Sequence, residues 1–215
     1  AASDVYKRQV QTNLLVEGFY TILDDVFALR DMDDAADGGK VKERYNGSGA
    51  TVRGFNVEGR AAFTRWFELQ AGVTLQQSRY KEPEFWSEDA EVPPVRRMFR
   101  TPDTYGYFTA SFKPVRNFTA DLSGTCTGSM LVQHMAGSGV AQDVAVSTPS
   151  FFDMNIRLSY DVRIYKEITM QLYGGVQNLF NAYQKDFDKG VDRDSGYIYG
   201  PSLPRSWFVG AKFSF

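Results

Sequence analysis

A chain of 215 residues, 43% of them hydrophobic, is long enough for one or two domains. Its net charge of −2 comes with scattered basic residues, so we expect no nucleic-acid partner. The single cysteine, Cys126, excludes an internal disulfide, and no Cys or His cluster has metal-ligand spacing, so no metal site and no cofactor are predicted. No apolar run approaches the roughly 18 residues of a membrane helix, which excludes a helical membrane protein.

The beginning of the chain differs from the rest. Residues 1–9 lack the apolar segment and small-residue cleavage site of a signal peptide. Asp4 to Gln9 looks like a translated sequencing-adapter remnant. We therefore expect residues 1–9 to be a non-native or disordered start, with an amino-terminal part missing, and the fold to occupy residues 10–215.

Eight segments alternate between apolar and polar residues, the period of a β-strand. In the clearest of them, Phe118, Leu122 and Cys126 share one face while Thr119 and Asp121 share the other, so Cys126 is predicted to be a small packing residue. The predicted strands follow one another up and down, near residues 12–23, 50–63, 67–79, 101–113, 117–132, 150–161, 167–178 and 204–215.

The connections between these segments alternate in length. Polar stretches with strand-breaking residues, at 30–48, 80–100, 133–148 and 181–203, are long, and the intervening turns at 64–66, 113–117 and 161–167 are short. The breakers include Pro93 and Pro94 in the second stretch and are mainly glycines in the other three. A soluble antiparallel sandwich also alternates apolar and polar residues, but it has no reason to sort loop length by parity. Transmembrane barrels do sort it, with long external loops and short periplasmic turns around strands of about 10 residues. His134, in the third long loop, is predicted to be a solvated histidine.

The membrane interpretation predicts which residues face lipid and which face the lumen. An Arg or Lys on the lipid face near the midplane costs about 2–4 kcal/mol, and the charged residues fall almost entirely on the polar face. Arg53 is the exception, and we expect it near the external rim. The lipid face is predicted to hold Ile156, Leu158, Leu172, Val176, Val209 and Phe213, and the lumen face Asp153, Arg157, Gln171 and Lys212.

The last 40 residues carry two motifs. A strand ends in Asn178, Leu179, Phe180 and Asn181, and later come Tyr199, Gly200, Pro201, Pro204 and Arg205 before a final aromatic strand. This arrangement resembles the last hairpin of TonB-dependent outer-membrane receptors. The ending, with Gly210, Phe213 and a terminal Phe215, is similar to the signal recognised by the outer-membrane barrel assembly machinery, although Phe208 stands where that signal favours a polar residue.

The resemblance implies an all-β fold: the last eight strands of a larger, 22-stranded type of antiparallel up-and-down barrel, seen as an open, curved sheet. It implies the outer membrane of a Gram-negative bacterium and uptake of a scarce nutrient. The implied partners are membrane lipid, the barrel assembly machinery, a small-molecule chelate, and the TonB complex through an amino-terminal part. A ferric siderophore or similar metal chelate is the expected cargo, with cobalamin or an oligosaccharide as the alternative.

In such receptors external loops grip the ligand, so loops 80–100 and 181–203 are the expected ligand-binding segments. The alternative role of the same residues is packing within the loops. The acidic stretch 186–194 lacks EF-hand spacing, and we leave open whether it binds an ion. The candidate ligand residues are Phe85, Trp86, Asp188, Arg193, Asp194, Tyr197 and Tyr199.

Two other classes of protein are alternative interpretations of the same pattern. Some outer-membrane barrels are lipases, but the only histidine here, His134, has no serine at strand register near it, so we predict no catalytic residue. A self-contained eight-stranded barrel with a structural or adhesive role is the second alternative, because eight strands can close around a side-chain-filled interior. Pairing between the first and last strands would favour it.

Overall fold

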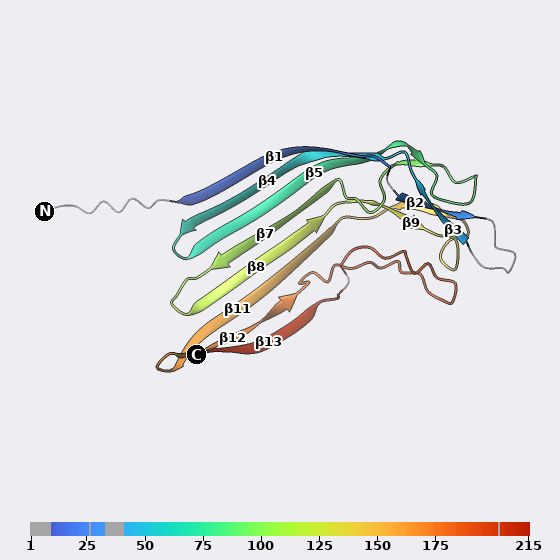
Figure 1. The fold of residues 1–215 in the computed structure, drawn as a ribbon. Coiled ribbons are helices and arrows are strands. Elements are labelled where there is room, and N and C mark those ends of the chain that lie inside the picture. Colours follow the sequence, from blue (N-terminus) through green and yellow to red (C-terminus); the bar gives the residue numbers. More distant parts are fainter. Residues whose placement is uncertain (1–9, 26, 33–40, 202) are drawn as a thin grey trace.

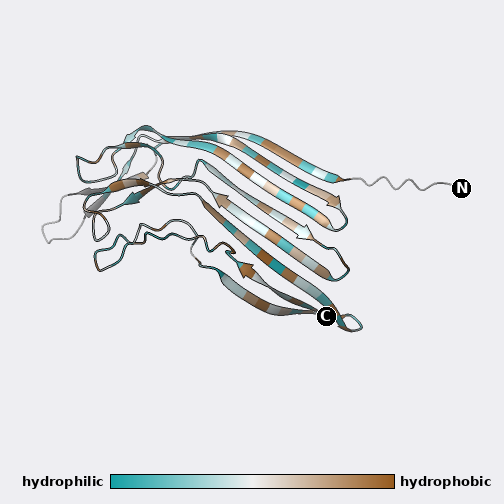
Figure 2. Ribbon diagram, turned by 180° about the vertical axis from the view of Figure 1, so that it is seen from behind, coloured by the Kyte–Doolittle hydropathy of each residue, from teal (hydrophilic) through white to brown (hydrophobic). Residues whose placement is uncertain are grey.

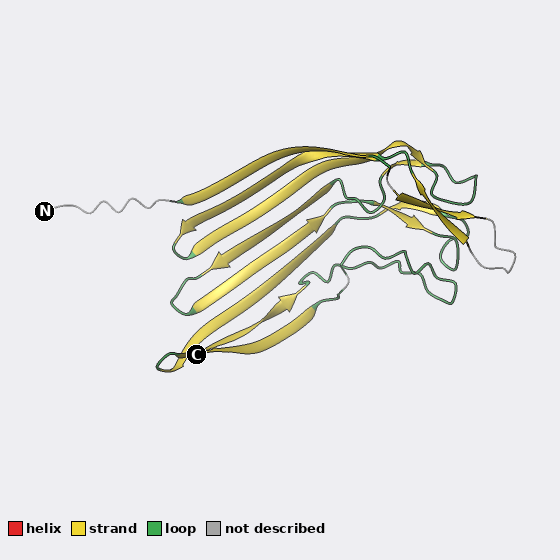
Figure 3. Cartoon of the chain, in the orientation of Figure 1, coloured by secondary structure: helices red, strands yellow, loops and turns green. Residues whose placement is uncertain are grey.

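The computed structural model describes residues 10–25, 27–32, 41–201 and 203–215. These residues form strands, turns and loops without any helix (Figure 3). Within them no helix is long and apolar enough to cross a membrane. Residues 1–9, predicted to be a non-native start, lie outside the described part, as does the middle of the 30–48 loop.

Eight long strands form one antiparallel sheet in which neighbours in sequence are neighbours in space (Figure 1). The predicted up-and-down order is therefore confirmed. Across the described residues β1 pairs only with β4 and β13 only with β12, so the sheet is open. Its strands are β1 (Gln11–Leu23), β4 (Ala50–Thr64), β5 (Phe67–Glu84), β7 (Thr104–Phe112), β8 (Phe118–Thr127), β11 (Phe151–Tyr165), β12 (Ile168–Gln177) and β13 (Ser206–Ser214).

The two ends of the sheet differ as the loop lengths predicted. At one end, which we call the short-turn end, tight turns join β4 to β5, β7 to β8 and β11 to β12. The other, the long-loop end, carries the long connections, and Figure 1 shows them gathered beyond the sheet. The start of β1 and the terminal Phe215 both lie at the short-turn end.

The long connections contain short strands that the sequence did not predict. A hairpin of β2 (Phe27–Met32) and β3 (Val41–Asn46) lies within the first, and β6 (Val95–Arg97) extends the ladder of β5 in the second. In the third, β9 (Leu131–His134) pairs with β10 (Val144–Ser147). The alternation of apolar and polar residues in these short strands covers too few positions to distinguish them from loops by sequence.

The predicted extent was wrong for several strands; β5, for example, continues to Glu84, into the predicted loop 80–100. The alternation from Phe118 to Met130 suggested a single strand over 117–132, but β8 ends at Thr127. The reason is the neighbouring strand: β7 begins at Thr104, whose carbonyl oxygen accepts the last bond, from the Gly128 N–H at 2.7 Å. Beyond that point β9 pairs with β10 instead. Conversely, β11 continues to Tyr165 through part of the predicted turn.

The register places apolar residues opposite apolar residues along one face of the sheet. Figure 2 shows the resulting alternation of hydrophobic and hydrophilic positions along each strand. Because Cβ atoms alternate between faces, directly paired residues share a face. One apolar row crosses six strands through Leu69, Ala110, Leu122, Ile156, Val176 and Trp207. Cys126 lies on this same face, opposite Gly106 and Phe152, and is exposed.

The opposite face carries the polar side chains, and these bond to one another. Ser111 donates to Asp121 Oδ1 at 2.7 Å. Arg157 donates to Gln171 Oε1 at 3.2 Å, and Gln171 Nε2 donates to Asp161 Oδ1 at 2.9 Å. This face is therefore cross-linked across strands, whereas the apolar face is left uncovered.

Phe208, which breaks the alternation of the last strand, has a packing role on the polar face. It lies opposite Gly175, and a Cβ added at Gly175 would be 2.8 Å from the Phe208 ring. Tyr173 contacts the same ring at a centroid distance of 6.4 Å, and the Arg157 guanidinium lies 4.7 Å from the Tyr173 ring. The aromatic ring thus fills the space above a glycine.

Candidate functional site

The longest well-described connection, 181–203 between β12 and β13, is closed at its base by two asparagines. Asn178 is 3% exposed; its Nδ2 donates to the carbonyl oxygens of Ala182 and Leu203, both at 2.9 Å. Asn181 Oδ1 accepts the N–H of Arg205 at 2.9 Å. Both asparagines adopt positive φ, 49° and 54°, a region that Asn tolerates better than most residues. The two asparagines of the Asn-Leu-Phe-Asn motif therefore bond the beginning of this connection to its end.

Inside the loop, two extended segments face each other through tyrosines and one aspartate. The hydroxyls of Tyr197 and Tyr199 donate to Asp186 Oδ2 at 2.8 Å and Oδ1 at 2.6 Å. Gln184, 1% exposed, accepts the Tyr199 N–H and donates to the Tyr197 carbonyl. Both tyrosine rings belong to a buried cluster with Val132 of β9. The loop is therefore a folded unit packed on the β9–β10 hairpin.

A histidine joins that unit to the hairpin. Nε2 of His134 lies 2.9 and 3.0 Å from the two carboxylate oxygens of Asp188, and its ring stacks on Tyr197 with centroids 3.7 Å apart. His134 is only 7% exposed. Its prediction as a solvated loop histidine was wrong, because its acidic partner is 54 residues away in sequence.

Further bonds connect three long connections into one layer. Asp194 Oδ2 accepts the Met135 N–H at 2.8 Å. Asp143 accepts bonds from Ser87 Oγ and from the Ala136 N–H, both at 2.7 Å. Arg100 donates to the carbonyl oxygen of Ile198 at 2.9 Å. Connections 80–100, 133–148 and 181–203 therefore cover the long-loop end together.

These contacts shift the ionisation of the loop groups. Burial acts to raise the pKa of Asp186, but the hydrogen bonds from Tyr199 and Tyr197 outweigh it and hold that pKa below its usual value. Burial, with the bond to Asp186, raises the pKa of both tyrosines. The hydrogen bond from His134 lowers the pKa of Asp188. At neutral pH the aspartates are thus charged acceptors and the tyrosines neutral donors.

The structure distributes the candidate ligand residues between two environments. Phe85 is 73% exposed, and Arg193 is exposed with one guanidinium nitrogen on the Gly190 carbonyl. Tyr197 and Tyr199 are 3% and 6% exposed, within the layer. Asp188 and Asp194 accept the hydrogen bonds given above. The Trp86 ring packs edge-on against Phe99. Phe85 and Arg193 are thus the two members of the set that lie exposed, and the other five take part in contacts within the loops.

The acidic stretch 186–194 shows how its carboxylates are used. Asp186 and Asp188 accept bonds from protein on both oxygens, as does Asp194, whose Oδ1 accepts the Gly196 N–H at 2.7 Å. In the part of the chain that the structure describes, no group of three or more His, Cys, Asp or Glu residues is arranged to hold a metal ion.

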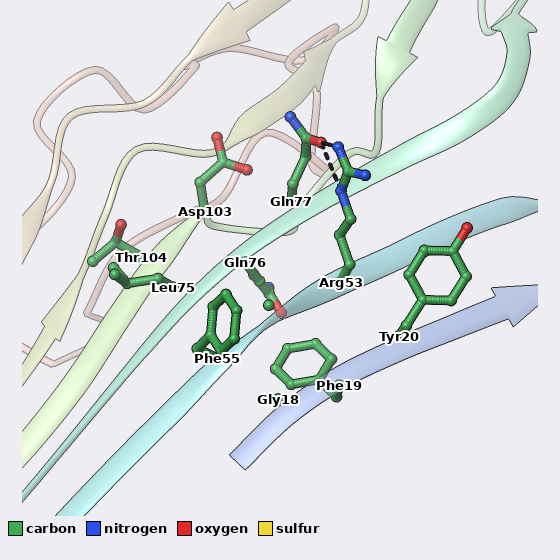
Figure 4. Close-up of a pocket in the computed structure, with 11 residues that line it drawn as sticks. Gly18, Phe19, Tyr20, Arg53, Phe55, Leu75, Gln76, Gln77, Asp103 and Thr104 are labelled. Carbon is green, nitrogen blue, oxygen red and sulfur yellow. Dashed lines mark hydrogen bonds between the residues drawn. The ribbon is translucent and has the colours of Figure 1, made fainter. Parts of the chain in front are cut away.

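A hollow of about 660 Å³ lies at the long-loop end of β1, β4 and β5 (Figure 4). Arg53 lines it beside Tyr20, and its Nε and Nη2 donate to Gln77 Oε1 at 3.2 and 2.7 Å. Arg53 thus lies near the end of β4 where the sequence placed it. Because β1 is the edge strand, the hollow opens at the margin of the sheet.

The residues that sequence reasoning missed are His134, Gln184, Asp186 and Asp143. One signal was present: Asp186 and Asp188, like Tyr197 and Tyr199, are two positions apart, the spacing that puts residues on one face of an extended segment. For His134 and Asp143 no local pattern indicates the partner.

Known structures share the fold of this chain, although its sequence matches no family model. No protein-family model and no curated protein matches the sequence. The solved structures that match in fold include the ferric-catecholate import receptor Fiu from E. coli K12 (18% identity, TM-score 0.61), the siderophore receptor PiuA from Acinetobacter baumannii (16%, 0.59) and the copper transporter OprC (13%, 0.62). They cover 96%, 93% and 95% of this chain, which in turn spans 25%, 25% and 29% of theirs. The chain has the antiparallel up-and-down β fold of part of these receptors.

Proposed function

We propose that this chain is the carboxyl-terminal part of the barrel of a TonB-dependent outer-membrane receptor that takes up a ferric siderophore or similar metal chelate. Its proposed location is the outer membrane of a Gram-negative bacterium. Lipid would cover the apolar face, the barrel assembly machinery would read the end around Gly210, Phe213 and Phe215, and the TonB complex would act through a preceding part of the protein.

The observation that carries the proposal is the fold likeness, over nearly the whole chain, to an import receptor, a siderophore receptor and a copper transporter. Two features of the sheet support a membrane setting. One face is apolar and uncovered across all eight long strands, including Val209 at 90% exposure and Trp207 at 77%. The long loops all lie at one end and the short turns at the other, as in barrels that cross a bilayer.

The cargo proposal draws on the names of those relatives and on the loop layer. One of the three is named a ferric-catecholate import receptor, one a siderophore receptor and one a copper transporter. The layer of long connections would present Phe85 as an apolar contact and Arg193 as a cation to an anionic chelate. Asp188, Asp194, Tyr197, Tyr199 and Trp86 would hold the shape of the layer.

A self-contained eight-stranded barrel is less well supported. Such a barrel pairs its first and last strands, whereas β1 and β13 lie at opposite ends of the strand order. An unpaired strand edge in hydrocarbon leaves its outward-pointing N–H and C=O groups unsatisfied, at a cost of several kcal/mol for each group. Further strands of a larger barrel would satisfy both edges.

Uptake by the complete protein tests the proposal. It would be expressed in a host deleted for its own siderophore receptors, and accumulation of labelled ferric siderophore would be followed with and without a working TonB complex. We expect accumulation that requires TonB and is induced by iron limitation. Growth that depends instead on cobalamin or an oligosaccharide would overturn the cargo, and uptake independent of TonB would overturn the receptor class.

A further inference from the structure

A groove of about 740 Å³ opens at the short-turn end of the sheet, between the β4–β5 turn and the β7–β8 turn. Backbone bonds fix its walls: the Lys113 N–H donates to the Trp66 carbonyl at 2.7 Å, and the Asp161 N–H donates to the Asn117 carbonyl at 2.8 Å. The groove is therefore a feature of the folded turns rather than of mobile side chains alone.

Three cations line this groove. Arg65 comes from the first turn, and Lys113 and Arg116 from the second, all exposed. Within the described residues no ion pair involves any of them. The one carboxylate in the lining, Asp161, has Oδ1 engaged by Gln171. The lining therefore carries three cations against one carboxylate, an excess of positive charge, although the Glu68 carboxylate lies near enough to Lys113 to interact with it electrostatically.

The apolar side of the sheet ends beside the groove in a stack of aromatic rings. Phe67 stacks on Phe63 at 5.4 Å and on Phe112 at 4.7 Å, and the Trp66 ring lies 6.0 Å from Phe67. Aromatic rings of this kind gather at the level of lipid headgroups in membrane barrels. Cations just beyond such a stack lie at the depth of the lipid phosphates.

We propose that this groove binds the headgroup of an anionic phospholipid from the leaflet at the short-turn end. The phosphate would lie among Arg65, Lys113 and Arg116, and the acyl chains would continue along the aromatic stack. The inference rests on the membrane placement proposed above. The charge pattern selects the class of ligand, since a basic pocket beside an apolar surface suits an anionic headgroup with its tails.

Native mass spectrometry of the complete protein in neutral detergent tests this. The probes are phosphatidylglycerol and phosphatidylcholine with identical acyl chains. The groove variant combines Arg65→Gln, Lys113→Gln and Arg116→Gln. The matched control removes the same charge at the long-loop end, through Arg53→Gln, Arg79→Gln and Lys81→Gln.

We expect phosphatidylglycerol affinity to fall roughly ten-fold or more in the groove variant, because each basic residue near an anionic headgroup contributes to binding. Phosphatidylcholine binding, and the control variant, should change little. Unchanged phosphatidylglycerol affinity in the groove variant, an equal loss in the control, or displacement of the lipid by equimolar inorganic phosphate would each overturn the proposal. If the triple variant does not assemble, the three single variants replace it, each with a few-fold loss expected.

Chelate uptake separates this inference from the proposed function. The groove variant should take up the chelate as the unsubstituted protein does. Failure of the unsubstituted protein to take up any chelate would contradict the cargo while leaving the lipid result to stand by itself.

Discussion

His134 and Asp188, 54 positions apart, meet through Nε2 and both carboxylate oxygens at 2.9 and 3.0 Å. Through this contact the β9–β10 hairpin holds the 181–203 loop. The stacked ring of Tyr197 covers the histidine from one side. The shape of the long-loop end therefore depends on a few polar contacts rather than on an extensive apolar core.

Replacing His134 tests this dependence. In His134→Ala, Asp188 loses its principal partner and Tyr197 its stacking partner, so hydrogen exchange in 181–203 should accelerate several-fold while the strands keep their protection. His134→Gln, which can still donate from a side-chain nitrogen, should retain part of the protection. Equal exchange in His134→Ala and the unsubstituted protein would show that the contact does not hold the loop.

Asn178→Ala should open the base of the same loop. The substitution leaves the carbonyl oxygens of Ala182 and Leu203 without their donor. An unpaired acceptor costs about 1–3 kcal/mol where it is buried, and less at the exposed Leu203, where water can replace the donor. Asn178→Asp keeps the acceptor for the Ala182 N–H but loses both donations, so it should also destabilise the loop. Exchange of 181–205 measures both, with the exposed Asn13→Ala as control, which should have no effect.

Loop docking should be stable over a window of pH. The pKa of Asp186 is lowered in the folded loop, so its contribution is present above its unfolded value of about 4 and is lost as the pH falls through the lower folded value. The pKa of Tyr197 and Tyr199 is raised, so their contribution is full below about 10 and is lost as the pH rises beyond it.

The mobility of a spin label in the loop measures the pH range over which the loop stays docked. The label would be placed by Val191→Cys, at a position 95% exposed, after Cys126→Ser removes the one thiol of these 215 residues. We expect a constrained spectrum at neutral pH and greater mobility at both extremes. Tyr197→Phe with Tyr199→Phe leaves Asp186 without its two hydroxyl donors, so the acidic limit should move to higher pH. An acidic limit unchanged in the double variant would contradict the assignment.

Glycines beneath aromatic rings should not tolerate a side chain. A Cβ at Gly175 would clash with the Ile156 carbonyl oxygen and lie 2.8 Å from the Phe208 ring, so Gly175→Ala should reduce the folded fraction of the barrel. Gly59→Ala is the matched control, because the nearest atom to its Cβ is 3.9 Å away. Heat-modifiable migration in gels measures folding of both, and equal folding would mean that the strands adjust freely.

The strand positions could be predicted because the alternation of apolar and polar residues that marks a barrel strand lies within the strand itself. The segment predicted at 167–178, for example, is the strand Ile168–Gln177. The ends of strands depended on neighbours: β8 stops where Thr104 begins the adjacent strand. The loop layer could be predicted least. His134 and Asp188 meet only because two loops fold over one another, and neither residue carries a local sign of its partner.

The role of Tyr197 and Tyr199 illustrates the same limit. Their ring chemistry suits ligand stacking and packing equally well, and only their burial, at 3% and 6% exposure, separates the two. Burial of a loop residue is set by contacts distant in sequence. The Asn178 to Asn181 motif is easier to interpret, because its turn conformation and the bond from the Ala182 N–H to Asn178 Oδ1 are local consequences of asparagine.

The central claim is that the apolar face contacts lipid and the polar face lines a lumen. Nitroxide labels placed singly in the membrane-assembled complete protein, with Cys126→Ser as background, test it through their accessibility to oxygen and to a water-soluble nickel chelate. Labels at Ile156, Leu158, Leu172, Val176, Val209 and Phe213 should favour oxygen, and labels at Asp153, Arg157, Gln171 and Lys212 should favour the nickel chelate. The reverse pattern would mean a register shifted by one residue, and equal accessibility of both sets to the nickel chelate would contradict the membrane barrel itself.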